Sequence, residues 1–192
     1  MLGVFIVLPV YTKDRNCRVS VNAGTRNLKT LYAQLRKADK SCSLLPKMYL
    51  EFSDRALMAE RYAEALWATQ SGIRKSVNTS VTNKLILNQG LAFIGKDRNE
   101  EAITVLKKLA IKGSRKHVDA RVKKVAHLAL IKAYYQKNQS PRNKNVNFLI
   151  NLYFHRYPDS PYDSILFEWC QDAGFTQTKQ YKIRKLSYTK SN

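Results

Sequence analysis

The chain has 192 residues, a length that predicts one folded domain or at most two closely packed pieces. It carries 34 Lys and Arg against 14 Asp and Glu, a formal net charge of +20, and 44% of its residues are hydrophobic. That apolar content excludes a disordered basic tail, because burial of apolar side chains can offset the entropy lost on ordering. With 7 Gly and 5 Pro, collagen-like, low-complexity and turn-dense all-β proteins are excluded as well.

An apolar N-terminal segment is predicted over residues 1–24. Its first ten residues are nearly all apolar, and basic residues follow at Lys13, Arg15 and Arg18. A bilayer-spanning helix needs about 20 such residues, so this run is too short to cross a membrane alone. It has the length of the hydrophobic region of a signal peptide, without a basic start or a small-residue cleavage site. Two interpretations stay open: a remnant of an export or membrane-attachment signal, or a segment docked on the fold.

Helical spacing of apolar residues follows, and it predicts an all-α domain over residues 25–175 with a basic C-terminal tail over residues 176–192. The predicted helices cover residues 28–38, 46–59, 62–70, 83–94, 99–111, 118–136 and 146–157, with a last helix from Ser160 that Gly174 closes. The stretch 71–82 is rich in Ser, Thr and Asn and predicts a connection. In the last helix, Ile165, Leu166 and Trp169 are expected to face inward.

The helices repeat in pairs. Ala65 and Ala102 align 37 residues apart, and the same offset aligns Ser53 with Gly90. The pattern is similar to the tetratricopeptide repeat, whose unit of about 34 residues needs small side chains where its two helices cross. The resemblance covers about residues 44–172. The ending at residues 155–161 resembles, more weakly, the repeats of bacterial cell-envelope proteins such as outer-membrane assembly lipoproteins and cell-division coordinators.

The resemblance implies antiparallel helix pairs stacked as a short right-handed superhelical solenoid. Such stacks bind an extended or helical peptide in a concave groove lined by the first helix of each pair. The groove residues that the repeat pattern implies are Lys47, Leu50, Lys84, Asn88 and Leu91. Lys84 and Asn88 fit one pair of a clamp for a terminal carboxylate, but Leu50 and Asp54 do not supply its other positions.

The sequence contains no recognisable catalytic arrangement. The three histidines form no metal-binding pair, the glycines form no phosphate-binding loop, and His127 lies in an apolar helix that favours a core position. We therefore expect no enzyme activity, no cofactor, no metal and no small-molecule substrate. Cys17 and Cys42 flank the first helix and form a disulfide or stay reduced according to the compartment, while Cys170 is expected to be a buried small side chain.

Two functions are compatible with these patterns. The first is a non-enzymatic adaptor or scaffold that binds a protein partner within a larger assembly, with a periplasmic or membrane-associated location slightly favoured over a cytoplasmic one. The alternative is a basic helical-repeat protein that binds nucleic acid or a ribonucleoprotein. A cluster of basic residues would hold the anionic partner, which charge alone leaves open as acidic protein, lipid or nucleic acid. The cluster consists of Lys112, Arg115, Lys116, Arg121, Lys123 and Lys124.

Overall fold

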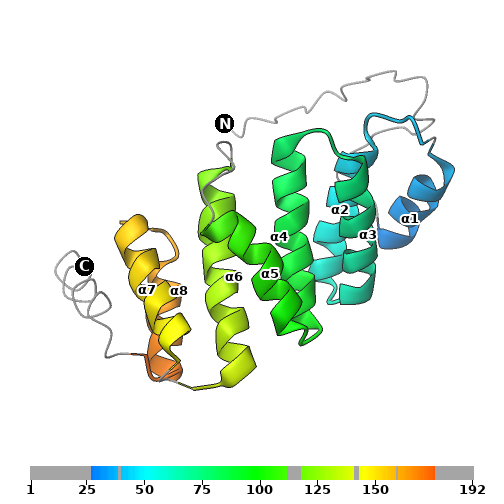
Figure 1. Ribbon diagram of the computed structural model, residues 1–192. Coiled ribbons are helices and arrows are strands. Elements are labelled where there is room, and N and C mark those ends of the chain that lie inside the picture. Colours follow the sequence, from blue (N-terminus) through cyan, green and yellow to red (C-terminus); the bar gives the residue numbers. More distant parts are fainter. Residues whose placement is uncertain (1–26, 39, 112–117, 141–142, 159, 176–192) are drawn as a thin grey trace, which may run out of the picture.

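The computed structural model describes residues 27–38, 40–111, 118–140, 143–158 and 160–175, and the regular structure of this part of the chain is entirely helical (Figure 1). The helices are α1 (Leu28–Lys37), α2 (Leu45–Met58), α3 (Tyr62–Lys75), α4 (Thr79–Gly95), α5 (Asn99–Ala110), α6 (Ala120–Asn138), α7 (Lys144–Arg156) and α8 (Asp163–Asp172). The predicted all-α class is confirmed.

The helices are stacked in a row that runs from α1 at one end to α7 and α8 at the other (Figure 1). α2 packs against α3 and α4 packs against α5, and α4 also packs against both α2 and α6. Consecutive helices run antiparallel because their connections are short, so α2 and α4 run in the same direction. α6 contacts α4, α5 and α7, which explains why its sequence is apolar on most sides.

Four of the helices begin at a polar residue that caps them. Asn27, Asn78, Asp119 and Asn143 precede α1, α4, α6 and α7, and each side chain accepts a hydrogen bond from backbone N–H groups of the first turn. These bonds satisfy donors that have no partner inside the helix. Pro46 lies in the first turn of α2, as predicted, where its missing N–H costs nothing.

The turn between α2 and α3 has the same backbone as the turn between α4 and α5. Glu60 and Asp97 both have a φ of 55°, the left-handed conformation. Arg61 and Arg98 follow with φ, ψ of −85°, 62° and −86°, 63°, and each begins the next helix. The two turns lie 37 residues apart, which is the offset that the sequence repeat predicts.

The hydrogen bonds of the two turns repeat as well. The N–H of Arg61 donates to the carbonyl of Ala56 at 2.8 Å, and that of Arg98 donates to the carbonyl of Phe93 at 2.9 Å. A bond across this span, with a left-handed residue before the donor, is the Schellman ending of a helix. In the second turn the Arg98 guanidinium also lies 4.8 Å from the centre of the Phe93 ring. The same Schellman ending therefore reverses the chain after α2 and again after α4.

Small residues lie where the paired helices cross. Ala65 and Ala102 are fully buried, and a methyl group added to Gly90 would lie 2.5 Å from the nearest Leu106 side-chain atom. Gly72 of α3 is equally confined, because an added methyl group would lie 2.8 Å from Tyr49 Cβ. Close approach of the helix backbones is thus the physical reason for the small residues.

The predicted connection over residues 71–82 is too long. α3 continues to Lys75 and α4 begins at Thr79, so only residues 76–78 link them. Ser71 and Gly72, which the sequence places in this connection, are buried inside α3 instead. Their low helix propensity is overridden by packing, because α3 needs small side chains against α2 and α4.

The last helix also differs from its prediction. α8 begins at Asp163, after a turn in which the Ser160 hydroxyl lies 2.6 Å from the buried Tyr153 hydroxyl and accepts a hydrogen bond from the N–H of Tyr162 at 3.3 Å. Ile165 is exposed, with 61% of its surface accessible, and Phe167 takes the inward position instead. Leu166 faces inward as predicted, and Trp169 is half-buried against the core. Gly174 closes α8 with a φ of 78°, as predicted.

We predict that Gly90→Leu lowers the free energy of unfolding by about 1–3 kcal/mol, because the new side chain overpacks the contact with the buried Leu106. Urea unfolding measures the change. Gln89→Leu adds the same side chain at the neighbouring half-buried position and is the control. Equal stability of the two variants would show that this crossing is not tight.

We predict that Glu60→Gly raises the free energy of unfolding by about 0.5–1 kcal/mol. A left-handed residue with a side chain costs about 1–2 kcal/mol, and glycine returns part of that gain through its larger unfolded-state entropy. Ala59→Gly is the matched control, because Ala59 has a φ of −93° and glycine gains nothing there. Thermal melting of both variants checks the sign, and stabilisation by Ala59→Gly alone would contradict it.

Candidate functional site

The residues predicted to line a groove lie on two adjacent helices. Lys47 and Leu50 belong to α2, and Lys84, Asn88 and Leu91 belong to α4. Both lysines are exposed, and both leucines are half-buried against the core. We call the surface formed by Lys47, Leu50, Lys84 and Leu91 the α2–α4 face. It combines cationic side chains with apolar ones, a combination that suits a peptide.

Asn88 has a different place from the one expected. It is buried, and its side-chain amide donates to Ser53 Oγ at 2.8 Å and to Asp54 Oδ1 at 2.6 Å. Both amide protons are therefore used to link α4 to α2, and Asn88 is a structural residue rather than one that meets a ligand. Sequence spacing missed this because the bonds depend on how α2 and α4 pack.

Asp54 is an acidic group beside the α2–α4 face. Burial is the largest influence on its carboxyl group and raises its pKa, as does the nearby Glu51 charge, while the Asn88 hydrogen bond and the Lys84 charge act in the opposite direction. The carboxyl group is therefore part of the α2–α4 contact. Because the Asp54 carboxylate already lies close to Lys84, it partly offsets the attraction of this lysine for an anionic partner.

The structure describes half of the predicted basic cluster. Lys112, Arg115 and Lys116 lie outside the described residues. Arg121, Lys123 and Lys124 lie in the first two turns of α6, where Arg121 is exposed and the other two are half-buried. The Lys124 ammonium lies 5.9 Å from the centre of the Tyr157 ring.

The three cysteines have different environments. Cys42 is disulfide-bonded, and Cys17, its expected partner, lies outside the described residues, so that pairing stays a prediction. Cys170 is free and fully buried, as expected for a small core side chain, and burial raises its pKa to about 12. A thiol with that pKa is a poor nucleophile at neutral pH.

His127 is a core residue, as predicted. It is fully buried, and its Nε2 lies 3.0 Å from the carbonyl of Leu149, to which the neutral ring donates. The ring edges contact Tyr153 and Tyr157. Burial lowers its pKa to about 4, which keeps the ring neutral at physiological pH. Among the residues with described positions, no three His, Cys, Asp or Glu side chains come together as a metal site.

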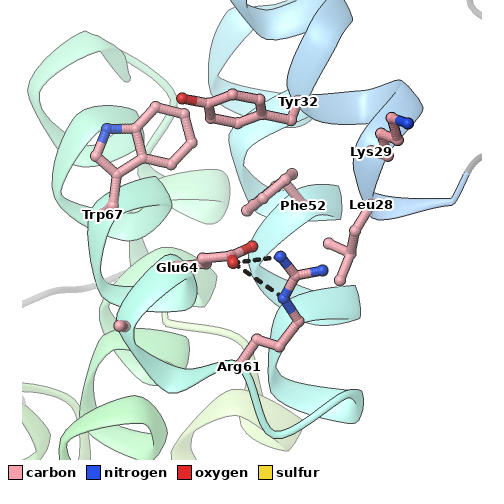
Figure 2. Close-up of a pocket in the computed structure, with 8 residues that line it drawn as sticks. Leu28, Lys29, Tyr32, Phe52, Arg61, Glu64 and Trp67 are labelled. Carbon is pink, nitrogen blue, oxygen red and sulfur yellow. Dashed lines mark hydrogen bonds and ion pairs between the residues drawn. The ribbon is translucent and has the colours of Figure 1, made fainter.

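A pocket of about 550 Å³ that the sequence patterns do not predict lies between α1, α2 and α3 (Figure 2). We call it the aromatic pocket, because Tyr32, Phe52 and Trp67 form its walls. Its other lining residues are Leu28, Lys29, Arg61, Ala63 and Glu64. The one local sequence signal for the pocket is that Ala63, a small residue, precedes the large Trp67 by one helical turn, which leaves space beside the tryptophan ring. The other lining residues come together only where α1, α2 and α3 meet.

No family model, no curated protein and no solved structure matches the chain. Of the eight helices described, none is long and apolar enough to span a membrane. The expected membrane or export signal falls on residues 1–24, which lie outside the described residues. A function for this protein therefore rests on the geometry of its surfaces.

We predict that His127 makes the protein less stable as the pH falls. Its pKa is lowered from 6.5 to about 4 in the folded protein, so between these values the unfolded chain binds more protons. Stability contributed by the neutral ring is complete above pH 6.5 and is lost toward pH 4, by about 3 kcal/mol in all. Urea unfolding across this range measures the loss.

His127→Gln supplies a non-titrating donor for the Leu149 carbonyl, so its stability should depend less on pH over the same range. His155→Gln changes an exposed histidine of α7 and controls for the change of residue type. An unchanged pH dependence in His127→Gln would mean that other groups cause the loss.

Proposed function

We propose that the protein is a non-enzymatic adaptor that holds a peptide segment of a protein partner on the α2–α4 face. The observation that carries the proposal is the placement of Leu50 and Leu91 beside Lys47 and Lys84 on two adjacent helices of the stack. Half-buried leucines supply apolar contact area, and the lysines orient an anionic or carbonyl-rich segment.

The proposal includes a right-handed superhelical stack of the tetratricopeptide class. The repeated turn at Glu60 and Asp97, with its 37-residue offset, supports it. A place in a larger bacterial cell-envelope assembly is also part of the proposal, supported by the resemblance of residues 155–161. The disulfide of Cys42 supports an oxidising compartment, because disulfides are rare in the cytosol.

A second candidate function is the binding of nucleic acid or a ribonucleoprotein. It is favoured by the clustering of Arg121, Lys123 and Lys124 at the start of α6, since cations are unfavourable near the N-terminus of a helix and the single carboxylate of the Asp119 cap offsets only part of their charge. A bound phosphate backbone would offset that repulsion. Phosphate contacts would also make binding steeply dependent on salt.

Salt distinguishes the two functions. Recovery of the protein with its bound partner from native cells, at low and at high salt, measures the dependence. We predict that most of the partner is retained at high salt, because contacts of Leu50 and Leu91 are not screened. Binding through phosphates would instead fall by about 0.9 in log K per released counterion on duplex DNA, for each unit of log salt.

Two variants complete this prediction. Leu91→Asp should release the partner, while joint removal of the Arg121, Lys123 and Lys124 charges should leave it bound. Val105→Asp, at a half-buried position of α5, controls for the general cost of an aspartate at such a site. Release of the partner by the basic-cluster variant alone, with Leu91→Asp still bound, would overturn the adaptor and favour nucleic acid.

A further inference from the structure

The aromatic pocket is open to solvent and lined by large rings that are only partly covered. Tyr32 is 42% exposed and Trp67 is 38% exposed, whereas Phe52 at the base is almost fully buried. The volume of about 550 Å³ lies within the range of ordinary ligand-binding pockets, roughly 300–1,000 Å³. Figure 2 shows Tyr32 and Trp67 above Phe52 and the Arg61–Glu64 pair below it.

The walls of the aromatic pocket are held in place before anything binds. The Trp67 ring lies 5.4 Å from Tyr32, 5.7 Å from Tyr49 and 5.7 Å from Phe52, measured between ring centres. Arg36 holds the far edge of Tyr32, because its guanidinium donates to the hydroxyl at 3.4 Å. Preformed walls lose little conformational freedom on binding, and this favours affinity.

The mouth of the aromatic pocket is cationic. Lys29 and Arg61 line it, and Arg36 lies beside Tyr32 on the same helix as Lys29. Glu64 is the acidic lining residue, and its carboxylate is paired with Arg61 through two guanidinium nitrogens. Figure 2 shows the third guanidinium nitrogen directed away from Glu64. The charges therefore favour an occupant with carboxylates on either side of an apolar group.

We propose that the aromatic pocket binds one large apolar side chain, Phe or Leu, from an acidic segment of a protein partner. The apolar side chain lies in the cavity against the contiguous surface that Tyr32, Phe52 and Trp67 form, and the flanking carboxylates meet Lys29 and Arg61. Aromatic residues and arginine are the side chains that most often dominate such interfaces.

This site is a second docking surface, separate from the α2–α4 face of the proposed function. Phe52 and Leu50 are two residues apart on α2, so their side chains point to opposite sides of the helix. A partner can therefore lose one contact and keep the other. Variants at Leu91 and at the aromatic pocket report on the two surfaces independently.

The repeat supplies a matched control for the aromatic pocket. Arg98 and Glu101 form the same ion pair at the start of α5 that Arg61 and Glu64 form at the start of α3. The rings are not repeated: Thr104 stands 37 residues after Trp67, where a ring would be needed. The second helix pair thus has the charges without the apolar walls.

Binding can be tested on the full chain with defined peptides. The protein has two tryptophans, so Trp169→Phe leaves Trp67, in the wall of the pocket, as the sole tryptophan, whose emission is excited selectively at wavelengths that tyrosine does not absorb. The probes are acetylated, amidated pentapeptides with Phe, Leu or Ala at the centre and two acidic residues on each side. A fourth probe keeps Phe and replaces the acidic residues with lysines, and a short oligo-dT strand represents nucleic acid.

We expect the Phe and Leu peptides to shift Trp67 fluorescence with saturation, and the Ala and lysine-flanked peptides to bind at least tenfold more weakly. Ala63→Leu should weaken the Phe peptide at least tenfold, because Ala63 is exposed and a leucine there fills the pocket without disturbing the core. Gln70→Leu, at an exposed position two turns further along α3, should have no effect. Arg61→Ala should weaken binding more than Arg98→Ala.

Other outcomes would overturn the proposal. Equal binding of the acidic and lysine-flanked peptides would remove the charge argument, and peptide binding that is insensitive to Ala63→Leu would place it elsewhere. Failure of every peptide to bind would mean that this pocket is not a peptide site. Tighter binding of oligo-dT, lost in Ala63→Leu, would assign the pocket to nucleic acid. Peptide binding that appears only after removal of residues 1–16 would assign it to the chain's own N-terminal segment.

Discussion

The chain reversal after α2, repeated after α4, is the constraint on which the remaining structure depends. At each reversal a left-handed residue, Glu60 or Asp97, allows the next N–H to bond back across the end of the helix. The reversal at Glu60 and the short connection over residues 76–78 return the chain to the direction of α2, so that α4 lies beside it. Asn88 can reach Asp54 only because of this alignment. The α2–α4 face follows from it, and the reversal at Glu60 also places α3 against α2, where the two helices and α1 form the aromatic pocket on the opposite side of α2.

Most of the basic residues of this protein have no acidic residue in the chain to pair with. Among the described residues, Glu51–Arg55, Arg61–Glu64 and Arg98–Glu101 form ion pairs three or four residues apart along the chain, and Lys137 pairs with Glu100 between two helices. With 34 basic residues and 14 acidic ones, pairing inside the chain leaves most cations unmatched. Exposed pairs of this kind add little to stability. An excess of this size attracts anionic molecules over a long range, which is the physical basis of the anionic partner proposed above.

Local patterns predicted the helices, and three-dimensional packing decided what the patterns could not. The spacing of apolar residues predicts the helices, because burial of one helix face shows as a local pattern. It fails at Ser71 and Gly72, which are small because α3 packs closely on its neighbours there and not because they form a loop. Asn88 was misplaced for a similar reason, since its partners lie 34 and 35 residues away. The aromatic pocket needs side chains from three helices. A sequence without a matching relative gives no direct indication of such a convergence.

Packing between neighbours along the row has a kinetic consequence. α4 contacts helices up to two positions away on either side, and no described helix packs extensively on one more distant than that. The loops that must close during folding are therefore short, and chains of low contact order fold quickly. Such an array need not open all at once, because each helix pair is supported only by its neighbours. Opening of α1 alone would therefore undo the aromatic pocket while the helices behind it stayed packed on one another.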